Sequence, residues 1–202
     1  MTDLVFAESQ GTEGAPLVFT FHGTGGSERQ FHDFAQSLIP GAHVISPRGT
    51  VNEHGALRYF KRTGEGVYDM DDLRERTQDM ARFLSEHRTR LGADRVVGLG
   101  YSNGANILMN VMLEHPDIFT DAMLLHPLIP WSPAPQPGLA QSRILITAGE
   151  MDPICPAQQT RALIAYLEQQ GADIRANWHS GGHNIMQSEV DAMSDFCAAI
   201  TA

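Results

Sequence analysis

Short apolar runs alternate with longer helical segments along most of this 202-residue chain, and that alternation restricts the fold more than any other feature. The expected strands lie at residues 4–7, 16–21, 43–46, 94–100, 121–125, 143–148 and 173–178. The expected helices lie at residues 28–38, 71–91, 105–113, 157–170 and 188–200. Strands and helices that alternate in this way form a mostly parallel sheet with helices on both faces. The sequence therefore predicts an α/β fold with about seven strands, in a single domain over residues 1–202.

The stretch 100–104 has the pattern Gly-x-Ser-x-Gly, with Ser102 at its centre. It joins a short apolar run, which predicts a buried strand, to a helical segment on which Asn106 and Asn110 would mark the wetter side. A serine at such a junction lies on a sharp turn at positive φ, and the flanking glycines let the strand and the helix pass closely. The pattern predicts that Ser102 is a nucleophile, and a glycine-flanked structural turn is the alternative.

Polar residues that follow the other strands are candidates for the same site, because chemistry in open α/β sheets gathers beyond the carboxyl ends of the strands. Asp152 follows the strand at 143–148, and His183 lies in the glycine-containing loop after the last strand. A serine hydroxyl needs an imidazole to take its proton, and the imidazole needs a carboxylate to fix its tautomer. The order Ser, Asp, His is that of α/β-hydrolase triads. We therefore predict Ser102 as nucleophile, His183 as base and Asp152 as the orienting carboxylate.

Both assignments have rivals in the sequence. His179 is the rival for the base, but it lies on or at the end of a strand, whereas His183 lies in a flexible loop. Glu150 and Asp173 are the rivals for the carboxylate. Glu150 is too near the strand end, while Asp152 precedes a proline on a turn from which a carboxylate can reach across.

A tetrahedral intermediate needs N–H donors for its oxyanion. In this fold they come from the residue after the nucleophile, here Asn103, and from an early glycine-rich loop. Thr24 is the expected second donor because it follows His22-Gly23 at a strand end, and Gly25 is the alternative. The loop could instead be a tight turn or a phosphate cradle, but the chain has neither a Gly-x-Gly-x-x-Gly pattern nor a P-loop lysine.

These motifs together resemble the phospholipase/carboxylesterase family of α/β-hydrolases. The matching segments are residues 21–26, 47–49, 100–106, 126–127, 152–156 and 182–183. Within that family the chain is similar to small carboxylesterases linked to hydroquinone or catechol stress, which are dienelactone-hydrolase-like; acyl-protein thioesterases belong to the same branch. The resemblance implies an α/β-hydrolase fold and a cofactor-free serine hydrolase of short-chain esters, often a homodimer. A true dienelactone hydrolase would carry cysteine where this chain has Ser102.

Two loops are expected to line the site. Residues 126–141 lie where a cap domain usually inserts and are too few for one, so we expect an open, uncapped site suited to small acyl groups. Residues 47–69 are expected to be a long loop, which could receive an aromatic or carboxylate-bearing ester or could cover the core with its aromatic side chains. Trp178 is expected in the core. The expected substrate-binding residues are Gly23, Arg48, Tyr59, Phe60, Arg62, Leu128, Ile129 and Ile154.

Composition restricts the partners and the location. A net charge of −10 argues against nucleic acid and anionic membranes as partners. The chain shows neither a signal-peptide pattern nor an apolar run near the roughly 20 residues that span a bilayer, so a cytoplasmic protein is expected. Cys155 and Cys197 provide no disulfide framework, and Cys155 is expected to be a small apolar residue in a loop rather than a redox thiol. The nine histidines show no metal-ligand spacing, so neither a metal nor another cofactor is expected.

Two classes of function agree with these features. The first is a serine carboxylesterase that hydrolyses small or short-chain esters through an acyl-enzyme on Ser102, with an acyl thioesterase or lysophospholipase as variants. The second is a non-catalytic ligand-binding protein on a hydrolase scaffold, because a fold does not determine a function. The chain keeps all three triad residue types and a candidate oxyanion loop, which favours the enzyme. The expected partner is a small-molecule ester, and a homodimer is implied by the resemblance alone.

Overall fold

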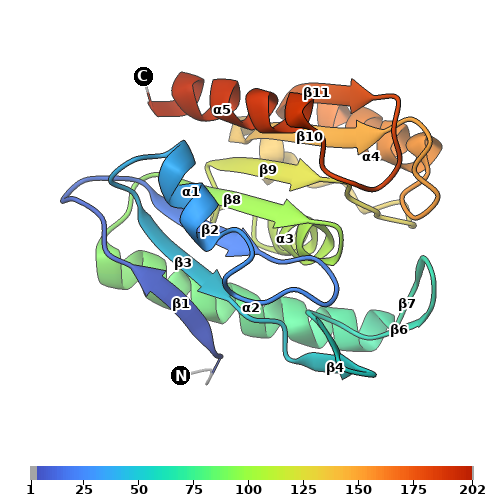
Figure 1. Ribbon diagram of the computed structural model, residues 1–202, viewed down its shortest axis with the longest axis horizontal. Helices are drawn as coiled ribbons and strands as arrows, with labels where there is room; N and C mark the ends of the chain where they lie inside the picture. The colour runs from blue at the N-terminus through green and yellow to red at the C-terminus, as the bar shows by residue number, and fades with distance from the viewer. Residues whose placement is uncertain (1–3, 202) are drawn as a thin grey trace.

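A seven-stranded sheet runs through the middle of the molecule in the computed structural model, which describes residues 4–201 (Figure 1). Its strands, in spatial order, are β1 (Phe6–Ser9), β3 (His43–Pro47), β2 (Leu17–Phe21), β8 (Val96–Tyr101), β9 (Asp121–Leu125), β10 (Arg143–Gly149) and β11 (Asp173–His179). Only the β1–β3 pair of this sheet is antiparallel. The predicted α/β fold with a mostly parallel sheet is confirmed.

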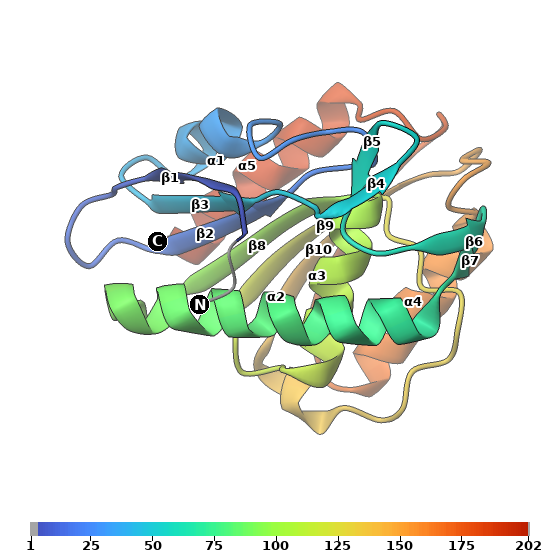
Figure 2. The same ribbon diagram turned by 90° about the horizontal axis from the view of Figure 1, so that it is seen from below.

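Helices cover both faces of the sheet (Figure 2). One face carries α1 (His32–Leu38) and α5 (Gln187–Thr201), and the other carries α2 (Met70–Leu91), α3 (Asn103–Glu114) and α4 (Ala157–Gln169). None of the helices within residues 4–201 combines the length and apolarity that a bilayer span needs.

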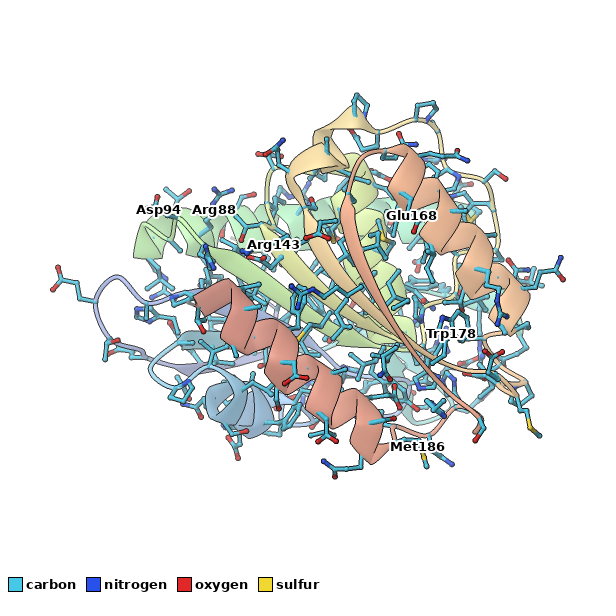
Figure 3. The ribbon with its side chains drawn as sticks, turned by 90° about the horizontal axis from the view of Figure 1, so that it is seen from above. Arg88, Asp94, Arg143, Glu168, Trp178 and Met186 are labelled. Carbon is cyan, nitrogen blue, oxygen red and sulfur yellow. The ribbon has the colours of Figure 1, made fainter. Side chains whose placement is uncertain are left out.

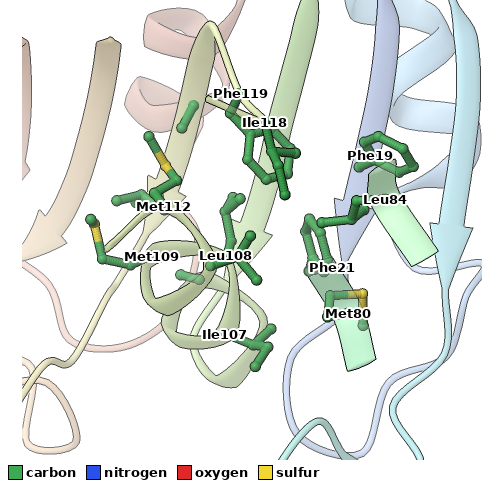
Figure 4. Close-up of a cluster of buried hydrophobic side chains, with 14 of the residues drawn as sticks. Phe19, Phe21, Met80, Leu84, Ile107, Leu108, Met109, Met112, Ile118 and Phe119 are labelled. Carbon is green, nitrogen blue, oxygen red and sulfur yellow. The ribbon is translucent and has the colours of Figure 1, made fainter. Parts of the chain in front are cut away.

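The central strands are buried on both faces, which explains their nearly continuous apolar sequences. All five residues of β2 are buried. Phe19 and Phe21 from β2 pack with Leu84 of α2 and Leu108 of α3 in the apolar cluster between the sheet and its helices (Figure 4). Each such side chain contributes about 1.5–3 kcal/mol through its removal from water. This packing holds the carboxyl end of β2 beside that of β8.

The strand register brings four strand ends to one edge of the sheet. Tyr101 at the end of β8 pairs with Leu125 at the end of β9, and Gly149 at the end of β10 pairs with His179 at the end of β11. The segments that follow these strands therefore meet at the same edge.

The segment 47–69 is not the plain loop that we expected. It contains two small hairpins, β4 (Val51–Glu53) with β5 (Ala56–Arg58) and β6 (Arg62–Gly64) with β7 (Val67–Tyr68). Strands of two or three residues are too short to show a hydrophobic period in the sequence. The segment between β9 and β10 contains one short 3-10 helix, Pro137–Gln141.

Asn106 and Asn110 do not mark a wetter side of α3, because both are buried. The helix packs against the sheet and beside α2, so both amides find partners inside the protein. Asn110 donates to the Thr77 hydroxyl at 2.6 Å, while Asn106 donates to the Tyr68 hydroxyl at 2.8 Å and accepts from the Leu128 backbone at 2.7 Å.

Trp178 is not a core residue. It is half-buried on β11, the edge strand of the sheet, near its carboxyl end (Figure 3). An edge strand has a neighbour on one side only, and here the Arg161 guanidinium covers the indole ring at 4.4 Å from its centroid.

Candidate active site

Ser102 lies in a strained turn between β8 and α3, with φ +52° and ψ −118°. A positive φ at a non-glycine residue is uncommon and persists only where the surroundings enforce it. The two glycines of the motif allow the close packing: a Cβ on Gly100 would lie 2.6 Å from the Gly104 carbonyl oxygen, and a Cβ on Gly104 would lie 2.3 Å from the Phe21 carbonyl oxygen. The turn therefore holds the serine at the end of the sheet.

The structure brings Ser102, His183 and Asp152 together in one hydrogen-bonded chain. The Ser102 Oγ lies 2.9 Å from His183 Nε2, and His183 Nδ1 lies 2.7 Å from Asp152 Oδ2. A carboxylate oxygen only accepts, so Nδ1 carries the proton and Nε2 is free to accept the serine proton. This is the tautomer that a general base needs.

The Asp152 carboxylate is buried and well supplied with donors. Its Oδ1 accepts the backbone N–H groups of Ile154 at 2.8 Å and Cys155 at 2.9 Å. Burial opposes its ionisation, but the Cys155 backbone N–H and the imidazoles of His183 and His126 outweigh burial and hold the pKa of Asp152 below its ordinary value. Asp152 therefore stays ionised at neutral pH.

The rivals have other partners. His179 Nε2 lies 3.2 Å from a Glu189 oxygen, and its Nδ1 accepts from the Gly181 backbone, so its ring is engaged away from Ser102. Glu150 forms an ion pair with Arg161 on the surface.

The glycine-rich loop after β2 lies beside the serine. Thr24 lines the same cavity as Ser102 and Asn103. The backbone N–H of Gly25 already donates to the Leu57 carbonyl at 2.9 Å, which leaves Thr24 as the better candidate for the second oxyanion donor.

A cavity of about 260 Å³ opens above Ser102. The expected residues Arg62, Leu128 and Ile154 line it. Arg62 of the second hairpin forms one ion pair with Glu53 of the first hairpin and another with Glu65 of its own hairpin.

Four expected substrate-binding residues do not face this cavity in the described part of the chain. Tyr59 and Phe60 are buried, and the Tyr59 hydroxyl donates to the Pro47 carbonyl at 2.8 Å. Ile129 is buried in the apolar core. Arg48 borders a different cavity and lies 3.7 Å from Glu28. Aromatic residues in a segment without visible periodicity give no indication of which way they point, so only the fold could place them.

Gly23 lies in the loop before the cavity rather than among its lining residues. A Cβ at this position would lie 2.7 Å from the Tyr101 ring, so the glycine permits a close approach between the loop and the end of β8. Its contribution is to the shape of the oxyanion loop.

The sequence analysis missed several polar side chains that line the cavity. The Arg58 side chain is only 4% exposed and donates to the Thr24 hydroxyl at 2.8 Å. The Tyr68 hydroxyl donates to the Leu128 carbonyl at 2.9 Å and accepts from Asn106. Arg58 and Tyr68 lie on the unpredicted hairpins, so no signal in the sequence pointed to them.

His126 was also missed as a site residue, although it directly follows β9. It is fully buried and has a positive φ of 50°. Its Nδ1 lies 2.8 Å from Asp152 Oδ2, and its Nε2 lies 3.0 Å from a Glu189 oxygen. The other site residues were predicted by inspecting the residues that follow each strand. The same inspection at the end of β9 would have identified His126.

Two sets of described residues have the side chains to hold a metal ion. The ligand atoms of His126, His179 and Glu189 lie within 4.8 Å of one another, and so do those of His126, Asp152 and His183. In the first set, the imidazole Nε2 atoms lie 3.0 and 3.2 Å from Glu189 oxygens, and neither atom makes a hydrogen bond of ordinary geometry. The second set shares two members with the hydrogen-bonded chain to Ser102.

Comparisons with known proteins agree with this fold. A model of the dienelactone hydrolase family matches residues 52–198. The Bacillus subtilis (strain 168) protein named "Putative hydrolase MhqD" is 36% identical over 179 residues, which cover 87% of this chain and 88% of that protein.

Solved structures also match over nearly the whole chain. The Agrobacterium tumefaciens (strain C58) protein Atu2452, of unknown function, is 52% identical with a TM-score of 0.94, over 97% of this chain and 96% of that one. A Bacillus cereus carboxylesterase is 31% identical with a TM-score of 0.90, over 98% of this chain and 94% of that one.

Proposed function

The chain belongs to the dienelactone hydrolase family, and on that basis we propose that it is a serine carboxylesterase that hydrolyses small carboxylic esters. The observation that carries the proposal is the continuous hydrogen-bonded chain from Ser102 through His183 to Asp152, with its serine end facing a cavity. The similarity to a Bacillus cereus carboxylesterase supports the same reaction class.

In the first half of the reaction, His183 Nε2 takes the Ser102 proton as Oγ attacks the ester carbonyl carbon. The negative charge that develops on the carbonyl oxygen is stabilised by the backbone N–H groups of Asn103 and Thr24. His183 then gives its proton to the leaving alkoxide, the C–O bond breaks, and the acyl group stays on Ser102.

In the second half, water attacks the acyl-enzyme. His183 takes a proton from the water, the same two N–H groups stabilise the second oxyanion, and the carboxylic acid leaves as Ser102 regains its proton. Asp152 stays ionised throughout and stabilises the imidazolium that forms in each half.

The cavity favours small acyl groups with a polar part. Its volume of about 260 Å³ lies below the roughly 300–1,000 Å³ typical of sites for drug-sized ligands. Arg58 and Arg62 lie on one wall, with Leu128 and Ile154 as apolar neighbours. A short acyl chain fits this space better than a fatty acyl chain.

A fluorophosphonate probe followed by peptide mass spectrometry tests the enzyme proposal. We expect one adduct, on the peptide that contains Ser102, and its loss in Ser102→Ala and His183→Ala. An intact protein that forms no adduct at Ser102 would favour the non-catalytic ligand-binding alternative.

A panel of p-nitrophenyl esters from short to long acyl chains, together with thioesters and a lysophospholipid, tests the substrate class. We expect the highest kcat/KM for the shortest esters. A preference for long acyl chains or thioesters would replace the carboxylesterase assignment with a lysophospholipase or an acyl thioesterase.

A further inference from the structure

His126 is held between two carboxylates behind the Ser102–His183–Asp152 chain. We propose that His126 is a positioning residue, a buried imidazolium between Glu189 and Asp152 that keeps His183 competent as a base at lower pH. The proposal rests on the proposed esterase function, because its effect is read in the reaction of Ser102.

The charge of His126 follows from its two contacts. Nδ1 lies 2.8 Å from Asp152 Oδ2, and Nε2 lies 3.0 Å from Glu189 Oε1. The Nε2–Glu189 contact is a close approach without the geometry of a hydrogen bond, whereas Nδ1 is hydrogen-bonded to Asp152. A ring that lies within 3.0 Å of two carboxylates is favoured as the cation, so we assign a proton to each nitrogen. No solvent screens the contacts, since the exposed fractions of the His126 and Glu189 side chains are both 0%.

Glu189 has the donors that an ionised carboxylate needs. Oε1 accepts from the Thr147 hydroxyl at 2.6 Å, and Oε2 accepts from the Met186 backbone N–H at 2.6 Å. Burial opposes its ionisation, but the contacts with His126, Thr147 and Met186 outweigh burial and hold the pKa of Glu189 below its ordinary value. Glu189 is thus a fixed negative charge on α5.

The other groups around His126 bring no competing charge. His179 Nδ1 accepts from the Gly181 backbone N–H, and its Nε2 lies 3.2 Å from a Glu189 oxygen without a hydrogen bond. The Tyr101 ring meets the imidazole edge to face, 5.9 Å between centroids, and the Cys155 thiol donates to the His126 carbonyl at 3.1 Å. His183 is hydrogen-bonded to the same Asp152 oxygen as His126, and the two ring centroids are 5.0 Å apart.

Asp152 Oδ2 receives two imidazole N–H groups, one from His126 and one from His183. His126 faces His183 through the shared Asp152 oxygen, whereas Glu189 contacts the opposite ring nitrogen of His126, so the positive end of the pair is directed at His183 and favours its neutral form. The acid limb of the pH profile, where His183 becomes protonated and activity is lost, therefore lies at lower pH than it would without the cation.

Glu189→Gln removes the cation with little change of shape. The Met186 N–H requires an acceptor at Oε2, so the amide oxygen takes that position. The amide NH₂ then faces His126 Nε2, which must present a lone pair, and His126 becomes neutral while its Nδ1–H stays on Asp152.

The test is the pH dependence of kcat/KM for a short p-nitrophenyl ester. We expect the acid limb of Glu189→Gln to move upward by roughly half to one pH unit, with a loss of kcat at the optimum of less than about tenfold. His126→Gln should move it in the same direction. His179→Gln is the matched control and should leave the limb unmoved, because it keeps His126 and both of its carboxylates in place. An unmoved limb in a folded Glu189→Gln would overturn the proposal.

Two measurements do not depend on catalysis. In wild type, ¹⁵N spectra should show both His126 ring nitrogens protonated at neutral pH, and a neutral ring would contradict the proposal. Metal analysis of the purified protein should find no stoichiometric ion. A stoichiometric ion in wild type that is absent from Glu189→Gln would mean that a metal ion, not a proton, lies on Nε2 of His126, and it would overturn the assignment.

The failure of the esterase proposal alone would look different. The spectra would still show the His126 imidazolium, but neither wild type nor any variant would show turnover that depends on Ser102.

The pH dependence of the protein's stability should also show that His126 is a cation. Burial opposes charge on His126, but Glu189 and Asp152 outweigh it and raise the pKa of the imidazole above its ordinary value. The pKa of His126 is therefore higher in the folded protein than in the unfolded chain, where it is about 6.5. The ion pairs stabilise the fold fully at a pH below the unfolded-state pKa, and this stabilisation is lost as the pH rises through the folded-state pKa. The Tm of wild type should therefore fall more than that of Glu189→Gln between about pH 6 and pH 9. Equal slopes would contradict the imidazolium.

Discussion

The strand-end segments that carry Ser102, Asp152 and His183 are held in a different way from the hairpins that carry Arg58 and Tyr68. The first group follows strands whose register in a buried parallel sheet fixes where each loop begins. The hairpins belong to two-stranded sheets of their own, outside the register of the main sheet, and are attached to it by side-chain packing and by isolated hydrogen bonds. Three hydrogen bonds are examples of these attachments. The Tyr59 backbone N–H donates to the Asn103 side chain at 2.8 Å, and the Gly25 N–H donates to the Leu57 carbonyl. The Lys61 backbone N–H donates to the Asp72 carboxylate.

This difference separates two requirements of the site. Proton transfer needs atoms held at hydrogen-bond distance, and a packed sheet can provide that rigidity. Substrate selection needs a wall whose shape and charge can change without disturbing the chemistry. We therefore expect changes at the strand ends to abolish turnover and changes on the hairpins mainly to alter KM.

Ser102→Ala should have the largest effect. Removal of the nucleophile should lower kcat/KM by at least about 10⁴-fold, because the acyl-enzyme can no longer form. The measurement is hydrolysis of a p-nitrophenyl ester, with a thermal melt to show that the variant is folded. Substantial remaining turnover in a folded variant would mean that the reaction does not depend on this serine.

Asp152→Asn should lower kcat by about 10³- to 10⁴-fold. Two backbone N–H groups hold the amide oxygen at the Oδ1 position, so the amide NH₂ would face His183 Nδ1. This contact favours the tautomer whose Nε2 carries a proton and cannot accept one from Ser102. Steady-state kinetics measure the loss, and a drop of only a few fold would show that the carboxylate is not needed to orient the base.

Arg58→Met should lower kcat/KM for a short ester by about tenfold, mainly through KM. Methionine keeps part of the side-chain volume but removes the guanidinium that contacts Thr24 and faces the cavity. Comparison of kcat and KM across the ester panel tests this. A loss as large as that of Asp152→Asn, confined to kcat, would place Arg58 in the chemistry and break the division between the two regions.

Arg62→Gln should have the smallest effect, within about twofold in KM and about 1 kcal/mol in stability. Its partner Glu65 is 57% exposed, so water and salt weaken the pair. The same kinetic panel at low and high salt provides the measurement. A change of tenfold or more would indicate that the second hairpin contributes a specific substrate contact.

The residues found from the sequence share one property, which is a fixed position at a strand end. Ser102 lies in a motif whose glycines are needed by the local packing, and His183 follows the last strand of an alternating pattern. The register of a parallel sheet then brings such residues together, so the fold class and the sequence positions were enough to predict that the three would meet.

The residues that the sequence did not reveal depend on tertiary contacts. Arg58 lies in a three-residue strand without a visible period, and its burial results from packing against Thr24 and Phe60. Glu189 lies near the start of α5, where acidic residues are common, and only the fold shows that it faces His126. Tyr59 and Phe60 were expected at the entrance because aromatic residues suit both a binding wall and a core.

Rapid quenching of wild-type enzyme mixed with p-nitrophenyl acetate detects the covalent intermediate itself. We expect a burst of one p-nitrophenol per active site and one acetyl group on the peptide that contains Ser102, both absent in Ser102→Ala. Full turnover without a burst and without acetyl on Ser102, or acetyl on another residue with Ser102→Ala still active, would contradict the proposed mechanism.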